Sequence, residues 1–266
     1  MRTPNLLDGQ VAIVTGAGRG IGRAAALALA EAGAAVVVAA RSATEVASVN
    51  DEIRHSGGQS LAIPTDISDM NQVDYLLVLA LRAFNRVDIL VNNAATVHPL
   101  GKVWETSPSA WHKLIAVNVV GPYFCARTVL PHLLERGSGR IINVSSGAAE
   151  LSIEGASAYT ASKAALERFS ATLAVEVAGT GVVVTTFRPG IVDTRMQAEM
   201  RQAPAYRFPQ ASRWQAWYDE GQLRPADEPA RALLWLASHF ASSSNGRLFS
   251  MNDESFRNRI EADLAP

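Results

Sequence analysis

The sequence has very little cysteine: Cys125 is the only one among 266 residues. A disulfide within the chain is therefore excluded, together with a structural zinc site that needs several cysteines. A single cysteine is typical of a protein that works in a reducing compartment. We therefore predict a cytoplasmic protein, and we predict no bound metal.

Neither an excess of one charge nor a long hydrophobic run is present. Lys and Arg number 24 against 25 Asp and Glu, so the charge balance does not favour a nucleic-acid partner. The most apolar region, Ala24–Ala40, is interrupted by Glu31 and Gly33 and is shorter than the roughly 20 residues of a spanning helix. No long apolar stretch precedes Asp8, so the start does not resemble a signal peptide. These absences predict a soluble protein with no membrane partner.

Apolar runs of strand length alternate with helix-like stretches along most of the chain. The predicted strands are Val11–Val14, Val36–Ala39, Leu61–Pro64, Ile89–Val91, Arg140–Val144 and Val182–Thr186. The predicted helices are Arg23–Ala32, Thr44–His55, Asn71–Phe84, Ser109–Leu134 and Ala158–Ala178. Short apolar runs without period-two alternation are typical of strands buried on both faces. The order predicts an α/β fold over residues 1–266: a single Rossmann-like, doubly wound domain with a mostly parallel sheet and helices on both faces.

The segment Arg195–Leu223 breaks this alternation. It concentrates aromatic side chains, namely Tyr206, Phe208, Trp214, Trp217 and Tyr218. A long insertion of this kind is often a lid or a binding loop, and we predict a substrate lid near residues 195–223. The alternative is a helical subdomain that its own aromatic side chains hold together.

A glycine-rich turn, Thr15–Gly22, follows the first predicted strand and opens the first helix. Gly16, Gly20 and Gly22 let the backbone turn tightly and let a pyrophosphate approach it. The free amides at the helix start and the helix dipole then hold the anion. Ile21 stands where the fingerprint G-x-G-x-x-G has its last glycine, so the spacing departs from it. The turn predicts a dinucleotide site, with a simple strand–helix connection as the alternative.

Two arginines predict which nicotinamide cofactor binds. The second strand ends in Ala39-Ala40-Arg41-Ser42, without the acidic residue that usually meets a ribose 2′-hydroxyl. Arg41 can instead pair with a 2′-phosphate, and Arg19 in the glycine turn can approach the same group. Two cations and no competing carboxylate favour NADP over NAD. The alternative is two solvated arginines.

A second pattern predicts proton-transfer chemistry. Tyr159 and Lys163 are four residues apart in a predicted helix, so their side chains share one face. A neighbouring ammonium group stabilises a phenolate and lowers the tyrosine pKa from its usual value near 10. Ser146 follows a predicted strand, at the end where such sheets bind ligands, and can hydrogen-bond a substrate carbonyl. The alternatives are a surface pair and an ordinary turn serine.

Taken together, these residues resemble the short-chain dehydrogenase/reductase family in its non-extended branch. The motifs that carry the resemblance are TGAGRGIG at residues 15–22, Asn92-Asn93-Ala94-Ala95, Asn118, Ser146, Tyr159-x-x-x-Lys163 and Pro189-Gly190-Ile191-Val192-Asp193-Thr194. They occur in the order and at the spacing of the family, and they span about Leu7 to Thr194. Ala95 stands where the family more commonly has Gly, and the C-terminal part lacks the usual Gly-Gly finish.

The resemblance implies roles for four catalytic residues. Tyr159 would be the general acid/base that moves the hydroxyl proton, and Ser146 would orient the substrate oxygen. Lys163 would bind the nicotinamide ribose and lower the pKa of Tyr159. Asn118 would hold a water that links Lys163 to solvent as a proton relay.

The resemblance also implies a set of cofactor contacts. Asp66 and Ile67 would meet the adenine, Asn93 and Ala94 the adenosine ribose, and Pro189–Thr194 the carboxamide. With the residues of the turn and the two arginines, the predicted cofactor residues are Gly16, Arg19, Gly20, Ile21, Arg41, Ser42, Asp66, Ile67, Asn93, Ala94, Tyr159, Lys163, Pro189, Gly190, Val192 and Thr194.

The predicted function is therefore NADP-dependent interconversion of an alcohol and a ketone or aldehyde. The aromatic segment favours a hydrophobic or ring-containing carbonyl compound as substrate. Family resemblance favours a homo-oligomer, either a homodimer through Ser109–Leu134 and Ala158–Ala178 or a homotetramer. Two alternatives remain: a dinucleotide-binding sensor or scaffold without chemistry, and lyase or isomerase chemistry on the same fold.

Overall fold

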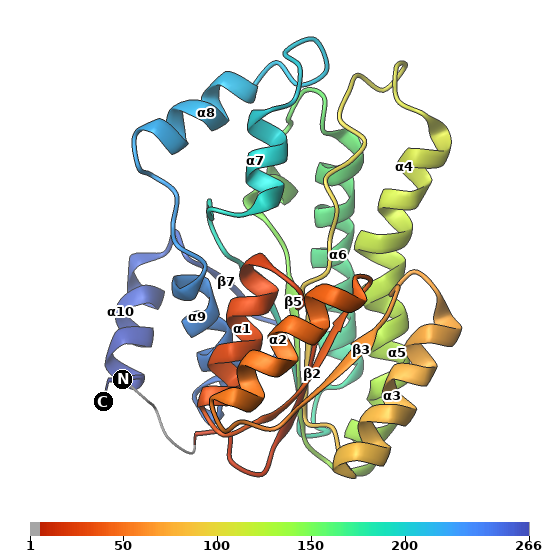
Figure 1. Ribbon diagram of the computed structural model, residues 1–266, viewed down its shortest axis with the longest axis vertical. Coiled ribbons are helices and arrows are strands. Elements are labelled where there is room, and N and C mark those ends of the chain that lie inside the picture. Colours follow the sequence, from red (N-terminus) through yellow and green to blue (C-terminus); the bar gives the residue numbers. More distant parts are fainter. Residues whose placement is uncertain (1–5, 266) are drawn as a thin grey trace.

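Seven parallel strands form one sheet in the computed structural model, which describes residues 6–265 (Figure 1). They are β1 (Val11–Thr15), β2 (Ala35–Ala40), β3 (Ser60–Pro64), β4 (Ile89–Asn92), β5 (Gly139–Val144), β6 (Val182–Arg188) and β7 (Leu248–Ser250). Their order across the sheet is β3-β2-β1-β4-β5-β6-β7. The direction of winding reverses between β1 and β4, which is where doubly wound sheets bind their ligands. The predicted Rossmann-like fold is confirmed.

Helices cover both faces of the sheet (Figure 1). One face carries α1 (Gly20–Glu31), α2 (Ala43–His55), α9 (Asp227–Ala237) and α10 (Glu254–Asp263). The other face carries α3 (Met70–Phe84), α5 (Gly121–Glu135) and α6 (Ser157–Glu176). The helix α4 (Pro108–Ile115) precedes α5 and contacts α6.

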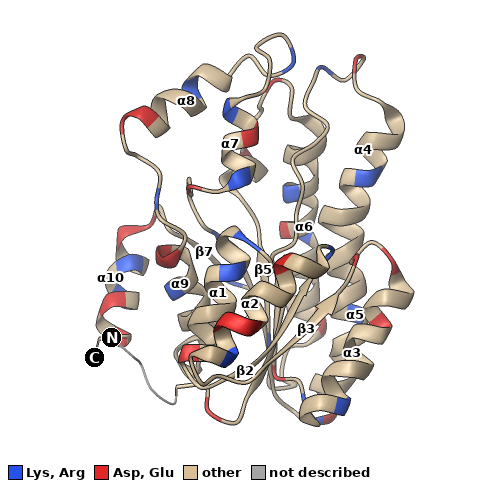
Figure 2. Ribbon diagram, in the orientation of Figure 1, with Lys and Arg blue, Asp and Glu red and all other residues tan. Residues whose placement is uncertain are grey.

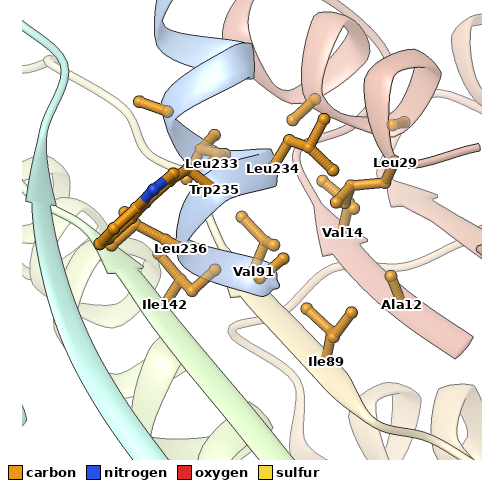
Figure 3. Close-up of a cluster of buried hydrophobic side chains, with 14 of the residues drawn as sticks. Ala12, Val14, Leu29, Ile89, Val91, Ile142, Leu233, Leu234, Trp235 and Leu236 are labelled. Atoms are coloured by element: carbon orange, nitrogen blue, oxygen red, sulfur yellow. The ribbon is translucent and has the colours of Figure 1, made fainter. Parts of the chain in front are cut away.

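Strand side chains alternate between the two helical layers. In β1, Ala12 and Val14 enter the core with α1 and α9, whereas Val11 and Ile13 enter the core with α3 and α5. Trp235 of α9 lies fully buried in the core formed with α1 and α9 (Figure 3). Its indole nitrogen donates a 2.7 Å hydrogen bond to Asp263 of α10. Because both faces of the sheet are covered, the strands appear in the sequence as unbroken apolar runs.

Two regions differ from the predicted pattern. The predicted helix Ser109–Leu134 is divided into α4, a π-helical turn at Ala116–Val120, and α5. A π-turn adds a residue to the helical repeat and often marks a functional site, and this one contains Asn118. Beyond Thr186, the structure adds β7, α9 and α10. The strand β7 has only three residues, so it is defined by its pairing with β6 and not by a sequence pattern.

The segment Arg195–Leu223 contains the helices α7 (Arg195–Arg201) and α8 (Ala211–Asp219). Its aromatic rings contact one another: the centroid of Trp214 lies 5.1 Å from that of Phe208 and 4.6 Å from that of Trp217. Phe208 is fully buried. This packing fits the helical-subdomain alternative, while the segment also borders the two cavities described below. Its role as a lid stays a prediction.

One helical stretch, Pro108–Glu135, is long and apolar enough to cross a membrane by length and composition alone, with a mean hydropathy of 1.3. A core helix meets the same criterion, and Leu114, Cys125 and Leu133 of this stretch are buried against other elements. Basic and acidic residues are interspersed over the described elements (Figure 2). Residues 1–5, which belong to the start interpreted as lacking a signal peptide, lie outside the described residues.

Candidate active site

The glycine turn lies between β1 and α1, and its geometry requires glycine. Gly16 and Gly20 have φ values of 64° and 55°, in the left-handed region that other residues rarely adopt. At Gly22, a Cβ atom would lie 2.3 Å from the carbonyl oxygen of Gly16 and 2.4 Å from Nδ2 of Asn93. Any side chain there would push the turn away from the neighbouring strand end.

Hydrogen bonds hold this turn against the end of β4. Asn93 Nδ2 donates a 3.0 Å hydrogen bond to the carbonyl oxygen of Thr15, and the Thr15 hydroxyl accepts from the backbone amides of Asn93 and Ala94 at 3.0 and 3.1 Å. The first turn of α1 begins at Arg19 with no side-chain cap. Its amides are therefore available to an anion, and the residues fit a bound pyrophosphate.

A cleft of about 280 Å³ begins at this turn. It brings together most predicted cofactor residues, which are Gly16, Arg19, Gly20, Ile21, Arg41, Ser42, Asp66, Ile67, Asn93, Ala94, Tyr159, Lys163, Pro189 and Thr194. Two predicted residues, Gly190 and Val192, lie outside its lining. Val192 is buried and forms a β-bridge with Arg224. Thr194 caps α7, where its hydroxyl accepts a 3.4 Å hydrogen bond from the amide of Gln197.

The adenosine end of the cleft carries a deprotonated acid. Asp66 accepts hydrogen bonds from the amide and the hydroxyl of Ser68 at 3.0 and 2.7 Å. Partial burial acts to raise the pKa of Asp66, but these bonds and the charges of Arg41 and Lys113 outweigh it, so the pKa lies below its usual value. An acceptor at this place fits the predicted adenine contact.

Near the predicted 2′-phosphate site, one sequence-based expectation is wrong. No carboxylate was expected beside the two arginines, yet Glu45 lines the cleft and its Oε1 accepts a 3.0 Å hydrogen bond from Arg19 Nη1. Glu45 is in the first turn of α2, four residues after Arg41. The residues at the end of the second strand do not reveal Glu45, because it reaches Arg19 only through the fold of the first turn of α2.

Tyr159 and Lys163 face the cleft from the first half of α6. Both are buried, with exposed fractions of 8% and 3%. Lys163 Nζ donates a 2.8 Å hydrogen bond to the carbonyl oxygen of Val144 at the end of β5, and it lies 5.8 Å from the centre of the Tyr159 ring. The structure therefore brings the predicted pair together in the cleft, which excludes the alternative of a surface pair.

Burial is the largest cause of the pKa shifts of both members of this pair. It raises the pKa of Tyr159, and a hydrogen bond with Ser146 acts in the opposite direction. Burial also lowers the pKa of Lys163 to about 8, although the charge of Glu167 acts to raise it. The expected lowering of the tyrosine pKa by Lys163 is not found, because desolvation of the phenolate dominates. Tyr159 is therefore protonated at neutral pH and can serve as an acid.

Ser146 and Asn118, the other two predicted catalytic residues, are not among the residues that line the cleft. Ser146 begins the short 3₁₀ helix Gly147–Glu150, where its hydroxyl accepts a 3.2 Å hydrogen bond from the amide of Ala148. The Asn118 side chain exchanges two 2.9 Å hydrogen bonds with the backbone of Thr96 and donates a third, of 3.1 Å, to Ser162. The Asn118 amide group is thus engaged in protein contacts, and it ties the π-helical turn to the loop after β4.

An ion-pair network of Arg188, Glu167 and Glu150 lies near the site and was not predicted from the sequence. Arg188, at the end of β6, makes two 2.7 Å hydrogen bonds to the carboxylate of Glu167 and a 2.8 Å ion pair with Glu150. Ser145 Oγ also donates a 2.8 Å bond to Glu167. The network joins α6, β6 and the Ser146 loop. Nothing in the sequence indicates that charges so far apart along the chain meet.

A second cavity of about 620 Å³ adjoins the cleft, and the two share Arg41, Thr96, Val117 and Glu199 in their linings. Its wall combines apolar side chains with His98 and with four charged side chains, namely Arg41, Lys113, Glu199 and Arg207. The aromatic side chains of Arg195–Leu223 are not among its lining residues. His98 Nε2, in the loop after β4, lies 3.3 Å from Glu199 Oε2 of α7, and both residues line the cavity.

Among residues 6–265, no group of three or more His, Cys, Asp or Glu side chains is arranged to hold a metal ion. The cleft itself brings together the buried tyrosine, the buried lysine and the glycine turn.

Comparisons with known proteins agree with this arrangement. A family model described as short chain dehydrogenase matches residues 10–205. The chain is 37% identical over 231 residues to the 3-oxoacyl-[acyl-carrier-protein] reductase of Synechocystis sp., covering 86% of this chain and 93% of that protein. It is 34% identical over 249 residues to the cis-4-hydroxycyclohexanecarboxylate dehydrogenase of Sinomonas cyclohexanicum, covering 91% and 95%.

A solved structure with bound NADP at low occupancy is similar as well. It is a Beutenbergia cavernae protein assigned as an NAD(P)-dependent gluconate 5-dehydrogenase, with a TM-score of 0.82 and 34% identity, covering 92% of this chain and 95% of that one.

Proposed function

The chain belongs to the short-chain dehydrogenase/reductase family of oxidoreductases, and from this premise we propose that it interconverts an alcohol and a ketone or aldehyde with NADP. The observation that carries the proposal is the buried Tyr159–Lys163 pair, which lies in the same cleft as the glycine turn. A protein that only binds a dinucleotide has no need of a buried tyrosine beside a buried lysine.

The proposed mechanism assigns a proton to Tyr159 and a hydride to the cofactor. The nicotinamide, when bound, supplies or accepts the hydride at the substrate carbon. In the direction of reduction, the Tyr159 hydroxyl donates its proton to the substrate oxygen, and the Ser146 hydroxyl donates a hydrogen bond to that oxygen as negative charge develops. In the direction of oxidation, the phenolate of Tyr159 accepts the hydroxyl proton.

Lys163 and Asn118 support this step in different ways. The Lys163 ammonium stabilises the Tyr159 phenolate that reduction leaves, and the carbonyl of Val144 keeps it in place. The side chain of Asn118 is engaged by Thr96 and Ser162, so a relay water at this position would have to use the backbone of the π-helical turn. In place of the expected water relay, we propose that the Asn118 side chain positions the loop that contains Thr96.

NADP is proposed over NAD because Arg41 is exposed at the end of β2 and makes no ion pair within the described residues. Arg19 supports the same preference more weakly, since it is paired with Glu45. Gly16, Gly20 and the uncapped start of α1 would hold the pyrophosphate.

For the substrate, we propose a hydrophobic or ring-containing carbonyl compound that also carries an anionic group. The apolar wall of the second cavity includes Leu100, Val117 and Pro204, whereas Lys113 and Arg207 give it positive charge. The names of two relatives support this class, because a hydroxycyclohexanecarboxylate and gluconate both contain a carboxylate.

A panel assay tests the proposed function. The protein is incubated with NADPH or NADH and a series of cyclic and linear ketones, and the absorbance of the reduced nicotinamide is followed. We expect oxidation of NADPH with at least one cyclic keto acid. Tight NADPH binding without turnover of any carbonyl compound would instead favour a sensor, and conversion of substrate without net cofactor oxidation would favour a lyase or isomerase.

We also propose a cytoplasmic homo-oligomer. Apolar side chains are exposed on α5 and α6, where Tyr123, Leu134 and Val175 are 46%, 43% and 76% exposed. Burying them between two copies of α5 and α6 would remove this surface from water. Analytical ultracentrifugation should show a dimer or a tetramer, and Val175→Asp should shift it toward the monomer.

A further inference from the structure

A carboxylate lies against Arg19, one of the two arginines that the proposed function assigns to the 2′-phosphate. The Arg19–Glu45 pair is 3.0 Å long, and both side chains line the cleft together with Arg41 and Ser42. The pair is partly shielded, with exposed side-chain fractions of 52% for Arg19 and 32% for Glu45. A 2′-phosphate that enters this place meets one negative charge as well as two positive ones.

The local structure directs Glu45 toward the glycine turn. A Cβ atom on Gly18 would lie 2.7 Å from Glu45 Cβ and 2.9 Å from its Oε2, so the side chain rests directly on the face of the turn. Ser42 Oγ accepts a 3.2 Å hydrogen bond from the backbone amide of Glu45 and fixes the first turn of α2. The absence of a side chain at position 18 is therefore what admits this carboxylate to the cleft.

We propose that Glu45 is a selectivity residue that weakens the preference for NADP, an inference that rests on the proposed dinucleotide function. Its charge repels a 2′-phosphate and competes with it for Arg19. Its oxygens can also accept a hydrogen bond from the free ribose hydroxyl of NAD, the contact that an acidic residue at the end of the second strand usually provides. Arg41 and Glu45 thus oppose each other, and the pocket admits both nicotinamide cofactors.

The chain supplies a matched control for this residue. Glu52 also lies on α2 and pairs with an arginine of α1, Arg23, but neither of these residues belongs to the lining of the cleft. Glu45→Gln and Glu52→Gln each remove one carboxylate charge and one ion pair from α2, the first with Arg19 just before α1 and the second with Arg23 in α1. Only the first substitution acts at the proposed 2′ position.

The experiment compares four nucleotides on the wild-type protein and both variants. Calorimetry measures the Kd of 2′,5′-ADP and of 5′-AMP, and fluorescence titration measures the Kd of NADPH and of NADH. We expect Glu45→Gln to lower the Kd of 2′,5′-ADP and of NADPH about five- to tenfold. The Kd of 5′-AMP and of NADH should stay the same or rise. Glu52→Gln should leave all ratios within about twofold. Glu45→Ala repeats the test with a variant that lacks the side-chain amide of glutamine, which could itself form hydrogen bonds.

The inference is overturned when the ratio of NADPH to NADH affinity in both Glu45 variants stays within about twofold of the wild type, or when Glu52→Gln shifts it equally. Its failure is distinct from that of the proposed function. A wild-type protein that binds none of the four nucleotides refutes both. A wild-type protein that binds them and reduces a ketone, with Glu45 variants of unchanged selectivity, refutes this inference alone.

Discussion

The ammonium group of Lys163 donates a 2.8 Å hydrogen bond to the backbone carbonyl oxygen of Val144, the last residue of β5. This bond attaches α6 to the end of the sheet, and Tyr159 lies one helical turn before it. The lysine gives up water for one carbonyl partner, so its charge is destabilised and its pKa falls to about 8. The relationship places a buried hydroxyl and a buried cation together beside the cofactor cleft.

Replacing the tyrosine hydroxyl should stop catalysis without affecting binding. Tyr159→Phe removes the proposed proton donor and should reduce turnover by about 10²- to 10⁴-fold, with the NADPH Kd nearly unchanged. Turnover and fluorescence titration measure the two effects. Tyr75→Phe, the same change at a tyrosine of α3 that is 58% exposed, serves as the control. A Tyr159→Phe protein that keeps more than about a tenth of the activity would exclude Tyr159 as the acid/base.

The buried lysine should make stability depend on alkaline pH. The pKa of Lys163 is about 8 in the folded protein and 10.5 in the unfolded chain, so between these values the unfolded chain binds more protons and the free energy of unfolding rises with pH. Relative to Lys163→Met, the wild-type protein should gain about 3 kcal/mol from pH 7 to pH 10.5. Urea unfolding of both proteins across this range measures the difference between their free energies of unfolding. Titrating groups remote from Lys163 contribute equally to both proteins and cancel. A constant difference would contradict the lowered pKa.

The ion-pair network behind the site should contribute to stability at its buried end only. Arg188→Met leaves Glu167 without its bidentate partner and should lower the free energy of unfolding by about 2–3 kcal/mol. Glu150→Gln should lower the free energy of unfolding much less, because the Glu150 side chain is 70% exposed and its ion pair is screened by water. Chemical denaturation of both variants measures the two losses in free energy of unfolding. Equal losses would show that burial does not determine how much each ion pair contributes to stability.

The glycine turn should not tolerate a methyl group at Gly22. Gly22→Ala places a Cβ atom 2.3 Å from a backbone oxygen, so we expect a loss of at least about 2 kcal/mol in stability and weaker NADPH binding. Gly147→Ala is the control, because a Cβ atom there meets nothing within 4 Å. Thermal unfolding and NADPH titration measure both. A Gly22→Ala protein with native stability would show that the turn can shift.

Arg207 should bind the anionic group of the substrate. Arg207→Gln should raise the KM for a cyclic keto acid about five- to tenfold and leave the KM for its neutral amide unchanged. Arg213→Gln is the control, because Arg213 stacks 5.0 Å from the Trp217 ring and does not line either cavity. Steady-state kinetics with the matched pair of ketones measures the effect. Equal KM changes for acid and amide would remove Arg207 from anion recognition.

Local patterns determined much of this protein. Strands buried on both faces require unbroken apolar runs, and a tight turn before a helix start requires glycine, so the sheet, the glycine turn and the Tyr159-x-x-x-Lys163 pair are all visible in the sequence. The elements with short or weak signals, such as β7, and the π-helical turn around Asn118 depend on pairing and packing with distant segments.

Only the tertiary structure decided which charges meet. Glu45 is directed at Arg19 by the first turn of α2, and Arg188 reaches Glu167 across α6 and β6. The tyrosine pKa is likewise a property of burial: an adjacent lysine predicts a lower value, whereas the desolvated site gives a higher one. Electrostatic interactions depend on distance in space and on exclusion of water, and neither quantity is encoded by spacing along the chain.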